Sequence, residues 1–165
     1  MRKFNFSEWL SSSGGPLVVV DESKAALWTG IDGQPSDYEI ACQASDYVST
    51  LTMHGSEVLV LGDEPLQTAI ATSDDFLLII RWKWADSEAD VHAAIKKIDF
   101  DAVSYIEKLN IEWLDKQLVM FDAADVFNSR QCLRLKINSR KNEISTFIYE
   151  PTSTTALLIH VITSL

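Results

Sequence analysis

The chain has 165 residues, of which 47 % are apolar, and its formal net charge at pH 7 is −10. This length predicts one domain with a core of its own, and the apolar share is too high for a disordered chain. The acidic balance argues against nucleic acid and anionic membranes as partners, because like charges repel.

The first third of the chain is predicted to contain short strands and one helix. Residues 6–10 form a candidate strand, the apolar run 17–20 is predicted to be a strand buried on both faces, and residues 24–28 are compatible with one helical turn. Ser36-Asp37-Tyr38-Glu39 has the pattern of a capping box, which predicts a helix over residues 37–44.

Four strands joined by tight turns are predicted next, and in chain order they would form a meander. They are residues 47–53, 57–61, 67–72 and 76–84. The last run is long, apolar and aromatic, which suits a central strand. Trp82 and Trp84 are predicted to share one face of it, with Arg81 and Lys83 on the other.

Two helices are then predicted, over residues 87–98 and 101–114. Acidic residues around Ser87 favour the start of the first helix, and apolar residues recur at helical spacing in both. Residues 117–121 are a predicted strand. The last forty residues alternate between apolar and polar, which predicts three strands in a half-solvated sheet. We therefore expect a single α+β domain, mainly antiparallel β-sheet with about three helices packed on it.

The negative charge is concentrated before residue 126. Residues 1–125 hold 9 Lys and Arg against 22 Asp and Glu, a net of −13, whereas residues 126–165 hold 5 against 2, a net of +3. An acidic surface attracts a basic partner. A plainer interpretation is that the charge keeps the protein soluble. The basic stretch Arg130 to Lys141 is interpreted as a solvated face.

The cysteines and the apolar runs predict a cytoplasmic protein without a membrane segment. Cys42 and Cys132 are far apart and form no CxxC pair, which favours a reduced compartment with both thiols buried. The first eight residues lack the apolar run of a signal peptide. The longest apolar stretches fall well short of the roughly 20 residues that a membrane span needs.

A search for catalytic and cofactor motifs supports none of them. The sequence has no phosphate-binding glycine motif, no HExxH and no GxSxG. His54, His92 and His160 are scattered, and each is predicted to be at the surface or partly buried. We therefore expect no cofactor, no metal site and no enzyme activity.

Paired carboxylates and tryptophans each have a structural and a functional interpretation. Acidic pairs favour turns and helix starts, and they could also serve acid–base chemistry. Trp82 and Trp84 are predicted to belong to the core, with the alternative that one of them anchors a partner.

Four motifs in fixed order carry a family resemblance over roughly residues 10–95. They are Ser12-Ser13-Gly14-Gly15-Pro16-Leu17, Asp37-Tyr38-Glu39-Ile40-Ala41-Cys42 with Asp46-Tyr47 following, Val60-Leu61-Gly62-Asp63-Glu64-Pro65-Leu66, and Ile80-Arg81-Trp82-Lys83-Trp84-Ala85-Asp86-Ser87. Together they resemble the immunity protein twenty-one family of bacterial polymorphic toxin systems. The resemblance implies a protein that binds and neutralises a cognate toxin in the cell that makes it.

The resulting hypothesis is a cytoplasmic inhibitor that occludes a toxin active site with an acidic surface. A basic nuclease is one candidate for the toxin domain. The residues expected to bind it are acidic turns and the start of a helix: Asp63, Glu64, Asp74, Asp75, Asp86 and Glu88. Two alternatives are a small acidic enzyme or ligand-binding domain with an unrecognised site, and a module that assembles only with itself.

Overall fold

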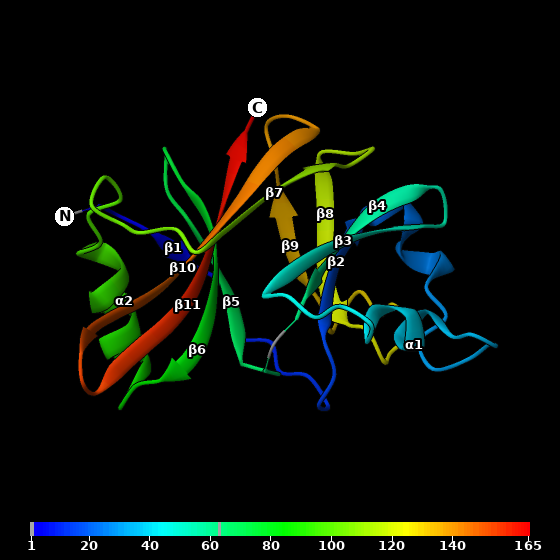
Figure 1. Ribbon diagram of the computed structural model, residues 1–165, viewed down its shortest axis with the longest axis horizontal. Helices are drawn as coiled ribbons and strands as arrows, with labels where there is room; N and C mark the ends of the chain where they lie inside the picture. The colour runs from blue at the N-terminus through cyan, green and yellow to red at the C-terminus, as the bar shows by residue number, and fades with distance from the viewer. Residues whose placement is uncertain (1, 63) are drawn as a thin grey trace.

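The computed structural model describes residues 2–62 and 64–165. In this part of the chain the strands form two antiparallel sheets, one of six strands (sheet A) and one of five (sheet B). Figure 1 shows sheet A with α2 on the left and sheet B with α1 on the right. The expected mainly antiparallel fold with three helices is confirmed for these residues, but the strands are divided between two sheets.

The strands of sheet A come from both ends of the chain. In spatial order they are β1 (Asn5–Phe6), β5 (Thr68–Thr72), β6 (Leu77–Trp84), β11 (Thr155–Ser164), β10 (Lys141–Thr152) and β7 (Glu107–Glu112). Sheet B has the order β3 (Val48–Met53), β4 (Ser56–Leu61), β2 (Leu17–Asp21), β8 (Gln117–Asp122) and β9 (Leu133–Lys136). The helices are the 3₁₀-helix η1 (Glu22–Leu27), α1 (Asp37–Ala41) and α2 (Glu88–Lys96).

Three apolar cores hold these layers together. The first lies between the sheets, where Ile79 and Ile144 of sheet A share a cluster with Leu59 of sheet B. The second packs α2 on the other face of sheet A, and the third packs η1 and α1 on the other face of sheet B. Both faces of β2 are covered, as predicted for its apolar run.

Both predicted helix starts are confirmed by their caps. The hydroxyl of Ser36 accepts from the backbone N–H of Glu39 at 3.1 Å, and that of Ser87 accepts from the N–H of Asp90 at 3.1 Å. Such caps satisfy amide groups that the first turn of a helix leaves unpaired. The stretch 24–28, compatible with one helical turn, lies largely within η1.

The predicted four-stranded meander is wrong. β3 pairs with β4 in sheet B and β5 pairs with β6 in sheet A, so the chain changes sheets between β4 and β5. The tight turns correctly indicate two hairpins. They do not determine whether consecutive hairpins share a sheet, because that depends on which apolar faces pack together.

The predicted helix over residues 101–114 is also wrong. This segment contains β7, whose partner is β10. Leu109, Ile111 and Trp113 follow one another at spacing two and all join the core between the sheets. Leu109 and Trp113 fit both the helical and the strand period, and pairing with a distant strand decided between the two.

Three predictions about exposure are wrong. β9 alternates between buried and exposed residues as predicted, but β11 is buried along most of its length, so the half-solvated sheet is wrong for the last strand. His160 on this strand is fully buried, although it was expected at the surface or partly buried. Cys42 follows the last residue of the short helix α1 and is exposed, and Cys132 is half-buried.

Candidate functional site

The carboxylates predicted to bind a partner do not form one patch. Asp74 and Asp75 are exposed in the turn between β5 and β6. Asp86 and Glu88 are exposed just beyond the opposite end of β6. An eight-residue strand separates its ends by roughly 23 Å, so these two pairs face different surroundings. Asp63 lies outside the described residues.

Glu64 belongs to the segment that crosses from sheet B to sheet A, and the buried side chain of Arg81 holds this segment in place. Nη2 of Arg81 donates to the carbonyl oxygens of Gly62 and Glu64, both at 2.7 Å. Arg81 is 2 % exposed and lies on β6. Sequence reasoning gave Arg81 no such role, although a single arginine beside a buried apolar run was a usable signal.

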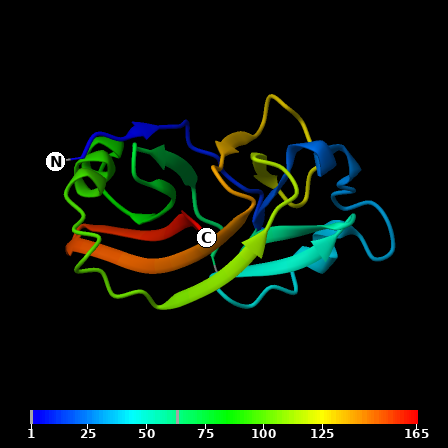
Figure 2. The same ribbon diagram turned by 90° about the horizontal axis from the view of Figure 1, so that it is seen from above.

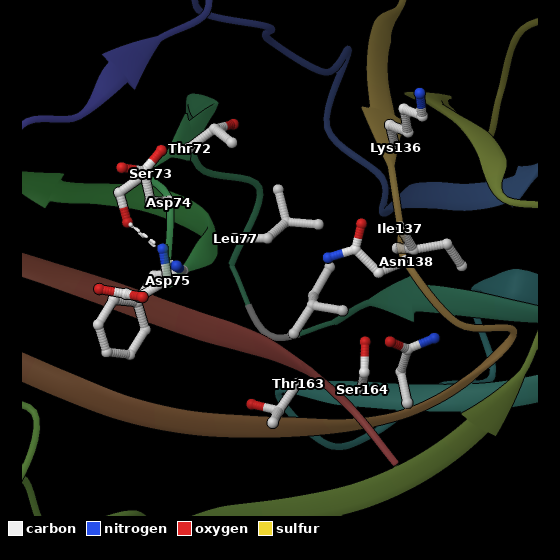
Figure 3. Close-up of a pocket in the computed structure, with 13 residues that line it drawn as sticks. Thr72, Ser73, Asp74, Asp75, Leu77, Lys136, Ile137, Asn138, Thr163 and Ser164 are labelled. Atoms are coloured by element: carbon white, nitrogen blue, oxygen red, sulfur yellow. Dashed lines mark hydrogen bonds between the residues drawn. The ribbon is translucent and has the colours of Figure 1, made fainter.

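A groove of about 570 Å³ opens between the β5–β6 turn and the end of β9. Figure 3 shows Asp74 and Asp75 on one side of it, and Lys136 and Asn138 on the other. The hydroxyl of Ser73 accepts from the N–H of Asp75 at 3.3 Å, and this hydrogen bond stabilises the turn. Its two carboxylates and the lysine across from them give the groove walls of opposite charge.

The acidic residues beyond β6 lie close to two tryptophans. Nε1 of Trp9 donates to Oε1 of Glu88 at 3.2 Å, and the Trp9 ring meets Trp82 edge-on with centroids 5.2 Å apart. Trp84, two residues before Asp86, is 45 % exposed. The prediction that both strand tryptophans belong to the core holds only in part, because Trp82 packs against the α2 core and Trp84 does not.

The two tryptophans face opposite sides of sheet A because the strand pairing shifts between them. Leu157 is paired with Trp82, whereas the preceding Ala156 is paired with Trp84. Leu157 packs in the α2 core, and neighbouring residues of a strand point to opposite faces. Trp84 therefore lies on the other face, and the predicted common face is wrong. A bulge of this kind inserts one residue into a strand and leaves no sequence signal here.

His160 lies in the layer between the sheets, near Arg81. Its Nδ1 is 2.8 Å from the hydroxyl oxygen of Thr146. Burial, and secondarily the positive charge of Arg81, lower the pKa of His160 well below its ordinary value. A neutral imidazole is therefore the stable form in the folded protein.

Residues 2–62 and 64–165 contain no group of three or more His, Cys, Asp or Glu side chains that could hold a metal ion. None of the helices in these ranges is long and apolar enough to span a membrane.

The four motifs that carry the family resemblance meet in space. A Cβ on Gly15 would lie 2.5 Å from the Tyr38 ring, so the first motif packs against the second through a glycine. A Cβ on Gly62 would lie 2.1 Å from the carbonyl oxygen of Asp46, so the second motif also packs against the third. Arg81 of the last motif binds the segment of the third. These motif residues therefore connect parts of the scaffold.

Comparison with protein families matches residues 8–153 to Immunity protein 21. The chain belongs to the immunity protein 21 family. This match confirms the resemblance drawn from the four motifs and extends it through β7, β8, β9 and β10, which contain none of these motifs. Among curated proteins and among solved structures, no match to the chain was found.

Proposed function

We propose that this member of the immunity protein 21 family binds a cognate toxin and neutralises it by covering the toxin active site with an acidic surface. The observation that carries the proposal is the family match over residues 8–153. The net charge of −10 and the exposed carboxylates of Glu64, Asp74, Asp75 and Asp86 support the electrostatic part of it.

The proposed mechanism combines attraction with steric exclusion. An acidic protein is drawn to a basic cleft over a distance comparable to the Debye length, which is about 8 Å at physiological ionic strength. At contact, carboxylates of the inhibitor pair with the Lys or Arg that would otherwise hold a substrate phosphate. A basic nuclease is the toxin class that fits this charge pattern best.

Co-expression tests the function directly. The chain is expressed together with the product of the adjacent gene, and cell survival and co-purification are measured. Survival together with a stable complex supports the proposal. Survival without a complex would instead favour an enzyme or ligand-binding domain, for which the groove of Figure 3 is the first place to look. Loss of both would contradict the immunity function.

Charge reversal then tests the acidic surface. D74K/D75K and D86K/E88K each change the net charge by four units, at opposite ends of β6. We expect slower association and weaker protection from the pair that faces the toxin, because rim charges act mainly on the association rate. D63K/E64K tests the crossing segment in the same way. If all three variants associate and protect like the wild type, an acidic surface does not direct binding.

A further inference from the structure

One face of sheet A is covered by sheet B only along part of its length. Arg81 is paired with Leu158, which is paired with Ile148 on the next strand. Paired residues of antiparallel strands lie on the same face. Arg81 reaches the carbonyl oxygens of the segment entering from sheet B, so Ile148 is on the face that sheet B partly covers.

The end of this face extends beyond sheet B. Figures 1 and 2 both show the turn between β10 and β11 at the end of the molecule far from sheet B. Ile148 is 40 % exposed there, and Trp84 is 45 % exposed on the same face. We call these two residues the Trp84 face.

The Trp84 face is built as a rigid surface. Trp84 is paired with Ala156, and its indole Nε1 donates to the carbonyl oxygen of Ser153 at 3.3 Å. Leu158, between Arg81 and Ile148 in the sheet, is fully buried. A partner would therefore meet an aromatic ring whose orientation is already set, and this reduces the entropy lost on binding.

Acidic residues border the Trp84 face. Asp86 is exposed two residues after Trp84. Glu64 is exposed, and its backbone carbonyl is bound by Arg81 of the same face. Asp46 is exposed next to Tyr47, whose carbonyl oxygen lies 3.5 Å from Nη1 of Arg81. An apolar centre with a charged border is the usual composition of a protein interface, and here the border is negative.

A second group of exposed apolar side chains lies on η1 and on loops beside sheet B, and it serves as a comparison. Leu27, Ile31 and Val126 are 51 %, 67 % and 58 % exposed. The loop of Ile31 contacts that of Val126, because a Cβ on Gly30 would lie 3.1 Å from the Val126 nitrogen. Ile31 and Val126 project from loops and Leu27 from the end of η1. None of the three is aromatic, so they offer a weaker anchor.

We propose that the toxin docks on the Trp84 face, placing an apolar side chain against Trp84 and Ile148 and Lys or Arg against Glu64 and Asp86. This inference rests on the proposed function and names the surface that performs it. The same cations can lie over the indole ring, an arrangement favourable for Lys and Arg.

The test compares matched variants of the two apolar groups. Trp84→Ala and Ile148→Ser change the Trp84 face, and Ile31→Ser and Val126→Ser change apolar residues on the other surface that are still more exposed. Dissociation constants for the purified toxin are measured by titration calorimetry, after thermal unfolding has shown that each variant is folded. We expect the first two to weaken binding by about 10- to 100-fold and the last two by less than about 2-fold.

Each remaining outcome overturns the inference in a recognisable way. Wild-type binding that all four variants retain would leave the immunity function intact and reject the Trp84 face. Weakening by Ile31→Ser and Val126→Ser alone would place the interface on the sheet B loops. No binding by the wild type would reject the proposed function itself. Sedimentation of the free protein measures its oligomeric state. A dimer that Trp84→Ala dissociates would assign this face to a second copy of the chain.

Discussion

Acidification should destabilise this protein through the buried side chain of His160. The ring is fully buried, its Nδ1 is bonded to Thr146, and its Nε2 has no hydrogen-bond partner in the described part of the chain. Burial and Arg81 lower its pKa in the folded state. The unfolded chain therefore binds a proton at a higher pH than the folded protein does, and stability must fall as the pH falls through the unfolded pKa.

The size of the effect follows from one proton. An unfolded histidine has a pKa of about 6.5, so between pH 7 and pH 5.5 it passes from mostly neutral to mostly protonated. If the folded ring stays neutral over this range, the free energy of unfolding falls by about 1.3 kcal/mol. This is a measurable part of the roughly 5–15 kcal/mol that typically stabilises a domain.

Urea unfolding at constant ionic strength, at pH 7 and at pH 5.5, measures this loss. His160→Gln keeps a hydrogen-bonding group near Thr146 and removes the titration, so its pH dependence should be shallower than that of the wild type by about 1.3 kcal/mol. His92→Gln, whose ring lies 3.5 Å from Glu88 on α2, is measured beside it as the comparison histidine variant. Equal slopes for the wild type and His160→Gln would refute the assignment.

Three further predictions concern the scaffold. Gly62→Ala places a Cβ 2.1 Å from the backbone oxygen of Asp46, so the free energy of unfolding in urea should fall by about 2–4 kcal/mol. An unchanged unfolding midpoint would mean that the crossing segment adapts freely. Arg81→Leu removes both charged hydrogen bonds to that segment and should lower the free energy of unfolding by about 3 kcal/mol, whereas Arg81→Lys should retain part of the stability. Equal losses for the two variants would show that the charge contributes nothing there. Ser87→Ala removes the cap on the Asp90 N–H and should cost about 1 kcal/mol, a value that a null result in thermal unfolding would contradict.

The exposure of the candidate site residues could be predicted, because charged side chains rarely lie in the core. Asp74, Asp75, Asp86 and Glu88 are all exposed, as expected for charged residues at turns and helix starts. Their distribution was not predictable, because it depends on which end of β6 each one occupies. The alternation of side chains along a strand predicts that Trp84 shares a face with Trp82. The bulge between them places Trp84 on the opposite face.

The family could be identified from the sequence because its motifs contain residues that the scaffold needs at close contacts. Gly15 meets the Tyr38 ring, and Gly62 meets a backbone oxygen, so neither position has room for a larger residue. The exposed apolar side chains Ile106 and Ile148 lie outside the four motifs. Recognition of the family therefore gave the expected function without locating a binding surface.

The caps at Ser36 and Ser87, the two hairpins and the apolar run of β2 could be predicted, because each depends on neighbouring residues along the chain. Tertiary packing makes residues 107–112 a strand and places the two hairpins in different sheets. It also decided that His160 is buried and that Trp84 is exposed. Those outcomes depend on pairing between segments far apart in the chain, where burial of apolar faces outweighs local propensity.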